Sequence, residues 1–237
     1  MSTIVALGGG GFSMEDDNIY LDAFIFGLAQ KERPKVCFVG TASGDAQSYS
    51  EKFLNAMEKH DVVANELLLY RPPVARDELE KYVLDQDVIY VGGGNTFNLM
   101  TLWKAWGLDE IFKKAHDQGV LLAGISAGSI CWFDGGVSDS FSPPGSDLLD
   151  AVEGIGLIAG SNCPHYDGEA YRRDQYHRLL KNGSLKDGIA AENGVALVYK
   201  KGRLAEVVSS SEEKFAYKIV VENGIVHEEK IRARFLG

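Results

Sequence analysis

Short apolar runs alternate with amphipathic segments over the first 130 residues of the chain. Runs with the length and β-branched content of buried strands occur at 4–7, 35–39, 65–70, 87–91 and 120–123. Apolar residues at three- and four-residue intervals predict helices over 18–29, 48–60, 77–84, 97–106 and 108–118. This alternation predicts an α/β protein with a doubly wound, mostly parallel sheet and helices on both faces.

The pattern changes after Trp132. Residues 134–150 are rich in Gly, Ser, Asp and Pro, which predicts an irregular surface loop, and residues 171–180 have helical spacing. The chain then ends in short β-type runs at 194–199, 204–208, 216–221 and 225–227. Turn sequences between these runs predict C-terminal antiparallel hairpins, which we expect to extend the same sheet system. Because no linker or repeat interrupts the pattern, we expect a single domain over residues 1–237.

Composition narrows the class of protein. The chain is 45% hydrophobic with a formal net charge of −10, which argues against a nucleic-acid partner because phosphate binding needs clustered Lys and Arg. No apolar run approaches the roughly 18 residues that span a bilayer, so we expect no membrane partner. The N-terminus reads as a first strand without the basic region of a signal peptide, and we expect a cytoplasmic protein.

The cysteines and glycines give no indication of a metal or cofactor. Cys37, Cys131 and Cys163 are widely separated and lack C-x-x-C spacing, so neither a disulfide framework nor a zinc site is predicted. The glycines at 8–11 do not form a convincing dinucleotide-binding pattern. We expect them to allow close backbone approach at the carboxyl edge of the sheet, where three glycine-rich turns, beginning at Gly8, Gly92 and Gly124, should meet.

The turn Gly124-Ile125-Ser126-Ala127-Gly128 lies between an expected strand and an expected helix. A Gly-x-Ser-x-Gly in this position is typical of a nucleophile elbow, where a strained turn exposes the serine hydroxyl. Ser126 is therefore the candidate nucleophile. The N–H of Ala127 is placed to stabilise an oxyanion, and a second N–H is expected from Gly93, Gly94 or Asn95.

A serine nucleophile needs a base, and histidine is the usual one. His60 and His116 lie near the ends of expected surface helices, His177 within a helix and His227 near the end of a terminal strand. His165 is the preferred candidate because it lies in a loop restrained by Pro164, directly after a short apolar strand.

The third member of a triad is a carboxylate that orients the imidazole. The acidic residues on expected loops are Asp134, Asp139, Asp147, Asp167, Glu169 and Glu192. Most acidic residues are solvated, but Glu192 stands between apolar residues at a strand start, where a carboxylate is expected to be partly buried and paired.

Four motifs together resemble the peptidase E family of serine peptidases, which also contains the cyanophycinases. They are Val91-Gly-Gly-Gly-Asn-Thr96, Gly124-Ile-Ser-Ala-Gly128, Asn162-Cys-Pro-His165 and Ala191-Glu-Asn-Gly-Val-Ala196, in the order of the family. The resemblance implies a flavodoxin-like or class I glutamine amidotransferase-like fold, with Ser126 as nucleophile, His165 as base and the Gly94 and Ala127 amides as oxyanion hole. For the third member it implies either Asp139 or Glu192, and the burial argument favours Glu192.

The resemblance also implies a substrate. Its best-known members remove an N-terminal aspartate from dipeptides, and cyanophycinases cleave a β-aspartyl-arginine polymer. We therefore expect a short peptide as partner and no cofactor, while a homodimer remains an open alternative. Arginines after His165 could bind a substrate carboxylate and acids there an amino group. The expected substrate contacts are Asn95, Tyr166, Asp167, Arg172 and Arg173.

Two other functions are weighed against a peptidase. An esterase of the α/β-hydrolase kind would use a histidine near the C-terminus, and no acid-bearing strand and helix precede His227. A non-catalytic ligand-binding or regulatory module could use the same scaffold, but it has no reason to retain a serine, a histidine and an acid. A glutamine amidotransferase would carry cysteine at the elbow, where Ser126 stands.

Overall fold

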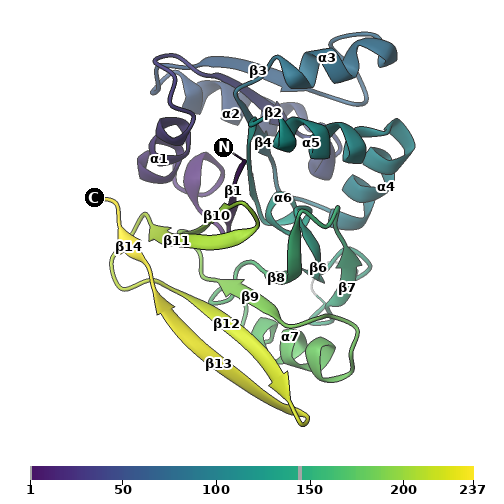
Figure 1. Ribbon diagram of the computed structural model, residues 1–237, viewed down its shortest axis with the longest axis vertical. Coiled ribbons are helices and arrows are strands. Elements are labelled where there is room, and N and C mark those ends of the chain that lie inside the picture. Colours follow the sequence, from purple (N-terminus) through teal and green to yellow (C-terminus); the bar gives the residue numbers. More distant parts are fainter. Residues whose placement is uncertain (1, 144–145) are drawn as a thin grey trace.

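A computed structural model describes residues 2–143 and 146–237, which form two β-sheets and the helices around them (Figure 1). The larger sheet has the strand order β14-β11-β10-β1-β5-β4-β2-β3. Its parallel part consists of β1 (Thr3–Leu7), β5 (Leu121–Ile125), β4 (Val88–Val91), β2 (Lys35–Val39) and β3 (Val63–Leu67). The predicted parallel α/β sheet is therefore confirmed.

Side chains along these parallel strands alternate between two hydrophobic cores, as the two-residue period of a strand requires. Val5 and Leu7 pack with helices α1 (Tyr20–Leu28) and α2 (Gln47–Met57). Ile4 and Ala6 face the opposite core, which contains apolar residues of α3 (Leu79–Leu84), α4 (Thr96–Trp106) and α5 (Leu108–Asp117). Helices thus cover both faces, and the sheet is doubly wound (Figure 1).

The second sheet has the order β13-β12-β9-β8-β6-β7. Its inner strands β6 (Phe133–Ser138), β8 (Ile158–Cys163) and β9 (Gly188–Ala191) are parallel, and β7 (Asp150–Glu153) pairs antiparallel with β6. Helix α7 (Arg172–Lys181) packs on this sheet through Tyr176, Leu179 and Leu180.

The expectation of one irregular loop over residues 134–150 is wrong in its first part, because residues 133–138 form β6. The glycines there allow strands to approach and do not make a turn. A Cβ on Gly135 would lie 2.5 Å from the Val152 carbonyl oxygen, and one on Gly136 would lie 2.4 Å from that of Asn162. Residues 139–149 do form a loop between β6 and β7 as far as the structure describes them, since Pro144 and Gly145 lie outside the described residues.

Both C-terminal hairpins are confirmed, but they belong to different sheets. The hairpin of β10 (Val195–Lys200) and β11 (Arg203–Ser209) joins the first sheet, where β10 pairs antiparallel with β1 and β11 is followed by β14 (Arg234–Phe235). The hairpin of β12 (Phe215–Glu222) and β13 (Ile225–Arg232) extends the second sheet through β9. The expectation that both continue one sheet system is therefore wrong for the second hairpin.

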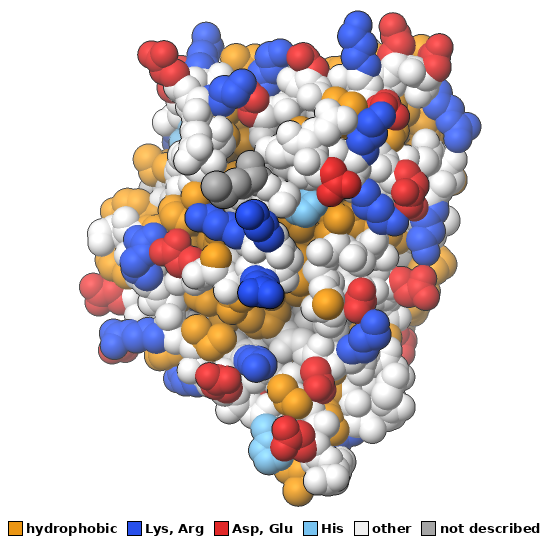
Figure 2. Space-filling model, in the orientation of Figure 1, with side chains coloured by type: hydrophobic (Ala, Val, Ile, Leu, Met, Phe, Trp, Pro, Cys, Tyr) orange, Lys and Arg blue, Asp and Glu red, His pale blue; other side chains and the backbone are white. Residues whose placement is uncertain are grey.

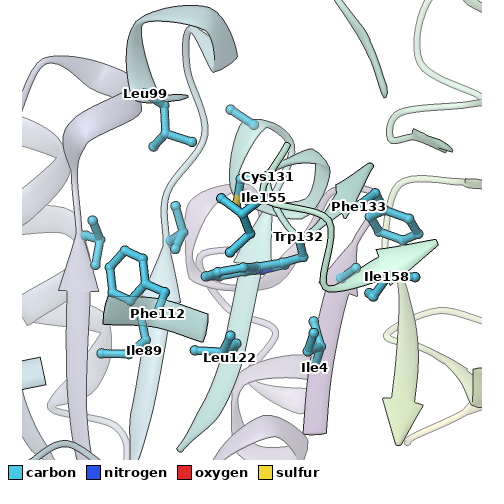
Figure 3. Close-up of a cluster of buried hydrophobic side chains, with 14 of the residues drawn as sticks. Ile4, Ile89, Leu99, Phe112, Leu122, Cys131, Trp132, Phe133, Ile155 and Ile158 are labelled. Carbon is cyan, nitrogen blue, oxygen red and sulfur yellow. The ribbon is translucent and has the colours of Figure 1, made fainter. Parts of the chain in front are cut away.

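An aromatic cluster joins the two sheets beneath the serine turn. Trp132 lies over Leu122 of the first sheet, between Phe112 of α5 and Phe133 of the second sheet (Figure 3). The ring centroids of Phe112 and Trp132 are 6.0 Å apart in an edge-on arrangement, and Trp103 lies 5.8 Å from Trp132. Short helix α6 (Ala127–Ile130) leads directly into this cluster, so the core anchors the chain that follows Ser126.

The surface shows no segregation of charge on the side that faces the viewer in Figure 2, where acidic and basic side chains are interspersed. No helix within the described residues is long and apolar enough to span a bilayer. The three cysteines are buried free thiols.

Candidate active site

Ser126 occupies a strained turn at the carboxyl end of β5. Its backbone has φ 57° and ψ −114°, a conformation that L-residues rarely adopt. The two flanking glycines make the turn fit. A Cβ on Gly124 would lie 2.1 Å from the Gly128 carbonyl oxygen, and one on Gly128 would lie 2.2 Å from that of Val91. Ser126 thus has the strand–turn–helix setting of a nucleophile elbow, as predicted.

The glycine turn after β1 holds the site together through three consecutive carbonyl groups. The Ser126 N–H donates to the Leu7 oxygen at 3.3 Å, and the His165 N–H donates to the Gly8 oxygen at 2.8 Å. The Gly194 N–H donates to the Gly9 oxygen at 3.0 Å. The candidate nucleophile and the candidate base are therefore fixed on adjacent peptide units, although they are 39 residues apart in the sequence.

His165 follows β8 in a left-handed backbone conformation, with φ 55°. Its Nδ1 lies 2.6 Å from the amide oxygen of Asn193. Because an amide oxygen can only accept, Nδ1 carries the proton and Nε2 retains its lone pair. Burial lowers the pKa of the imidazole, an effect that the hydrogen bond to Asn193 opposes. Nε2 has no hydrogen-bond partner among the described residues, and a half-buried neutral imidazole with its Nε2 lone pair available is the form that a general base needs.

Close backbone approach at Gly8 and Gly9 makes room for this pair, which confirms the use expected for these glycines. A Cβ on Gly9 would lie 2.1 Å from the Asn193 amide oxygen and 3.0 Å from His165 Nδ1. A Cβ on Gly8 would lie 2.4 Å from the Glu192 carbonyl oxygen. Any side chain at Gly9 would displace Asn193 from the imidazole.

Asn193, and not Glu192, contacts the imidazole, which corrects the preferred assignment of the third residue. The Glu192 carboxylate is half-buried and paired, as the sequence argument required, but its partners lie on β12. It accepts hydrogen bonds from the Phe215 N–H at 3.0 Å and the Tyr217 hydroxyl at 2.8 Å. Asp139 lies exposed in the loop after β6, on the wall of the same pocket, and no hydrogen bond to His165 is among those of the described residues.

Asp167 fixes the backbone of Asn193. Its carboxylate accepts the Asn193 N–H at 2.7 Å and binds the Lys214 ammonium at 2.6 Å. It therefore orients the residue that orients the base, and it does not line the pocket as a substrate contact was expected to do.

Ser126 and His165 open into one pocket of about 760 Å³. Its wall includes four more of the residues that the sequence proposed for the site, namely Gly94, Asn95, Asp139 and Arg172. Glu169, one of the acids considered after His165, also lines it. Thr96, Tyr171 and serines of the 139–149 loop line it too, and they were not expected. Their only sequence signal is position, since they stand next to predicted turns.

Arg172 is the one predicted substrate arginine that faces the pocket. Its side chain is only 7% exposed, and its Nε donates to the Glu169 carboxylate. This ion pair lowers the pKa of Glu169 although burial acts in the opposite direction. No acceptor for its two Nη groups is found among residues 2–143 and 146–237.

Tyr166 and Arg173 lie outside the pocket, contrary to expectation. Arg173 pairs with Glu228 on β13 and lies 5.4 Å above the Tyr166 ring. The Tyr166 hydroxyl donates to the same carboxylate, which is also 2.7 Å from His177 Nε2. This cluster ties α7 and the loop after His165 to the C-terminal hairpin.

In the loop after β4, one N–H beside Ser126 has no acceptor among the described residues. The Gly92 N–H donates to the Val39 oxygen, the Gly93 N–H to the Tyr49 hydroxyl and the Asn95 N–H to the Ala42 oxygen, at 3.0, 3.2 and 2.8 Å. Neither the Gly94 N–H nor the Ala127 N–H has an acceptor within the described part of the chain. These are the two donors expected to form an oxyanion hole.

Asn95 has a structural task at this loop. Its side-chain oxygen accepts the Asn98 N–H at 2.8 Å and caps α4, while its amide nitrogen donates to the Ser140 carbonyl at 2.9 Å. Asn95 therefore connects the glycine loop to the 139–149 loop across the pocket, and both ends of its amide are already bonded. The described residues contain no group of three or more side chains placed to bind a metal ion.

Comparison with known proteins places the sequence in a family. Residues 4–207 match the model of peptidase family S51. The uncharacterized peptidase YgaJ of Bacillus subtilis (strain 168) is 46% identical over 237 residues, which is the full length of both chains.

Two solved structures share the fold. A peptidase from an acI-B1 Actinobacterium superposes with a TM-score of 0.71 at 19% identity, covering 98% of this chain and 95% of the other. A putative peptidase E protein from Listeria monocytogenes EGD-e superposes with a TM-score of 0.57 at 17% identity, covering 98% and 99%. At these identities the likeness establishes the fold, and the family follows from the sequence matches. The chain belongs to peptidase family S51, and it is a peptidase.

Proposed function

We propose that this protein is a serine peptidase that hydrolyses short peptides through an acyl-enzyme on Ser126. The observation that carries the proposal is the attachment of Ser126 and His165 to the adjacent carbonyls of Leu7 and Gly8, so that both side chains open into one pocket. Family membership favours a peptide bond over an ester as the target and gives no support to a non-catalytic module.

The proposed reaction uses each of these groups in turn. The Ser126 Oγ attacks the scissile carbonyl carbon and passes its proton to His165 Nε2. The oxyanion that forms accepts hydrogen bonds from the Gly94 and Ala127 N–H groups. The C–N bond then breaks as the imidazolium donates its proton to the leaving amine. Water attacks the ester in the same way, with His165 again taking the proton, and releases the acid product.

Asn193 replaces the usual carboxylate in this proposal. Its amide oxygen holds the Nδ1–H tautomer and the ring orientation, but it carries no charge with which to stabilise the imidazolium. Two nearby carboxylates favour the charged imidazole, first Glu169 and then Asp167, and Asp167 also holds the Asn193 backbone and is paired with Lys214.

Substituting Asn193 separates orientation from charge. We expect Asn193→Ala to lower kcat by between about 10- and 10⁴-fold, since a catalytic histidine loses its orienting partner. Glu192→Gln is the matched control and should keep a kcat close to wild type. Asn193→Asp should retain activity and move the acid limb of the kcat/KM profile to higher pH, because a carboxylate favours the imidazolium. Steady-state kinetics across pH measure all three, and a larger loss in Glu192→Gln than in Asn193→Ala would contradict the assignment.

The pocket favours a short peptide with a carboxylate close to the scissile bond. A volume of about 760 Å³ suits a small ligand, and Asp139, Ser140, Ser142, Pro143 and Ser146 form part of its wall. Arg172 lines its wall, and its two Nη groups, which have no acceptor among the described residues, form a fork that matches a carboxylate. An N-terminal aspartate in a dipeptide meets both conditions.

A panel of dipeptides tests this substrate class. Asp-Leu, Glu-Leu, Arg-Leu and Leu-Leu should be compared by kcat/KM, together with an N-acetylated Asp-Leu. We expect the acidic substrates to be preferred. Equal rates for Asp-Leu and Arg-Leu would rule out a carboxylate-selective site, and no cleavage of any member would rule out a dipeptidase.

Arg172 and Arg173 form a matched pair for the same question, because they are neighbours in sequence but face different surroundings. We expect Arg172→Gln to raise KM for Asp-Leu by about 10- to 100-fold, as a charge-assisted hydrogen bond is lost. Arg173→Gln should leave KM unchanged and lower the melting temperature, since its partner is Glu228 on β13. An unchanged KM in Arg172→Gln would remove Arg172 from the binding site.

A further inference from the structure

The loop after β4, which carries the proposed oxyanion donor Gly94, begins with three consecutive glycines, Gly92 to Gly94. Glycine backbones adopt many orientations at little cost. Gly94 itself has φ 137°, in a region closed to most side chains. The direction of its N–H therefore depends on what holds the neighbouring peptides. Of the acceptors that do so, those of Val39 and Ala42 are backbone carbonyls. Tyr49 is the one side chain among them.

We propose that Tyr49 is a positioning residue for the reaction: its hydroxyl binds the Gly93 N–H and so turns the Gly94 N–H toward the oxyanion. The inference rests on the proposed function, because it assigns a role to a group that supports the same oxyanion hole. Gly93 lies where it can pass the effect of Tyr49 on to the oxyanion hole. A Cβ on Gly93 would lie 3.3 Å from the Cβ of Ser126 and 3.8 Å from its Oγ, so the side-chain position of Gly93 faces the nucleophile.

Tyr49 is itself held rigidly. Its ring stacks on Phe12 with centroids 5.6 Å apart and packs edge-on against Phe38 at 5.2 Å. Gly92 leaves room for it, since a Cβ there would lie 2.8 Å from a ring carbon of Tyr49. The hydroxyl is 2.7 Å from Ser13 Oγ. Because the hydroxyl accepts from Gly93, its own proton is free to be donated to Ser13.

This arrangement links the turn after β1 to the loop after β4. Ser13 ends the 3₁₀ turn Gly11–Ser13, and Tyr49 lies in α2, which packs on the α1 side of the sheet. None of these residues lines the pocket, so Tyr49 acts on the reaction only through the Gly93 peptide.

The test is Tyr49→Phe, which removes the oxygen and keeps the ring contacts. We expect kcat for the best dipeptide to fall by about 10- to 100-fold while KM stays unchanged. This decrease should not exceed the one caused by removing an oxyanion-hole donor outright. The rate of inactivation by diisopropyl fluorophosphate should fall in parallel, because its phosphoryl oxygen uses the same donors. Binding of the ground state does not use them, so a general loosening of the pocket would raise KM instead.

Two further variants control the experiment. Tyr82→Phe removes a hydroxyl that donates to the Glu66 carbonyl at 2.9 Å, away from the site, and should leave both rates unchanged. Ser13→Ala leaves the Tyr49 oxygen able to accept from Gly93, so its loss of kcat should be smaller than that of Tyr49→Phe. If Tyr49→Phe matches Tyr82→Phe while Ser126→Ala is inactive, the role of Tyr49 is wrong and the proposed function stands. If Ser126→Ala is active, the proposed function itself fails.

Discussion

Replacing Ser126 by alanine is expected to abolish peptide hydrolysis, with kcat falling by at least about 10⁴-fold. The proposed nucleophile is lost, and what remains is the binding and oxyanion contribution of the site. The elbow should survive the change, because the strained turn is set by close contacts of Gly124 and Gly128 and not by the hydroxyl. Hydrolysis of Asp-Leu, followed by release of leucine, measures the effect.

The control for this experiment is Ser184→Ala, since Ser184 is an exposed serine in the turn after α7. Both variants should unfold at the wild-type temperature. Substantial turnover by a folded Ser126→Ala protein would show that another group attacks the peptide bond.

His165→Ala is expected to cause a loss of comparable size, because the hydroxyl of Ser126 is then left without a base. The pH profile gives an independent view of the same residue. Burial lowers the pKa of His165 from its ordinary value of 6.5. The neutral, basic form therefore persists to more acidic pH, and the acid limb of kcat/KM should have its midpoint below 6.5.

His60 is a matched control for that profile. Burial also lowers its pKa, but it packs edge-on against Phe26 on the α1 and α2 side of the sheet. His60→Ala should leave the acid limb in place. An acid limb that persists unchanged in His165→Ala, or one well above 6.5 in the wild type, would exclude His165 as the base.

The same linkage affects stability. A histidine whose folded pKa lies below its unfolded value binds fewer protons in the folded state. Its contribution is therefore complete above pH 6.5 and declines as pH falls below it. His60, His116 and His177 are shifted in the same direction as His165, mainly by burial. Acidification below 6.5 should thus weaken the fold as well as the reaction.

Much of the first sheet could be predicted because its information is local. Buried parallel strands are short apolar runs, and the helices between them have helical spacing, so the doubly wound core follows from residues 1–130. The second sheet was harder to predict. Gly135 and Gly136 have the composition of a turn, and only the neighbouring strands show that they allow close pairing.

The elbow could be predicted for the same reason, since Gly124, Ser126 and Gly128 carry its geometry within five residues. The partner of the base could not. Glu192 and Asn193 are neighbours whose side chains leave the backbone in different directions, and β12 receives one while His165 receives the other. Which of the two side chains reaches His165 depends on the space left by Gly9 and on the position of β12, and both are distant in sequence.

Arg172 and Arg173 present the same difficulty on a helix. Adjacent helical residues differ by about 100° in direction, so one faces the pocket and the other faces β13. Which is which depends on how α7 packs on the second sheet through Tyr176 and Leu179. The sequence therefore indicates both arginines as candidates, but it does not show which face of the helix points to the pocket.

Covalent labelling of the folded protein with diisopropyl fluorophosphate, followed by peptide mapping, tests the central claim most directly. The serine of an activated pair displaces fluoride and retains the phosphoryl group, whereas an ordinary serine does not react. We predict one adduct, on Ser126, formed in wild type and absent from Ser126→Ala. Failure to modify Ser126, or an adduct at another residue with loss of activity, would contradict the claim that Ser126 is the nucleophile.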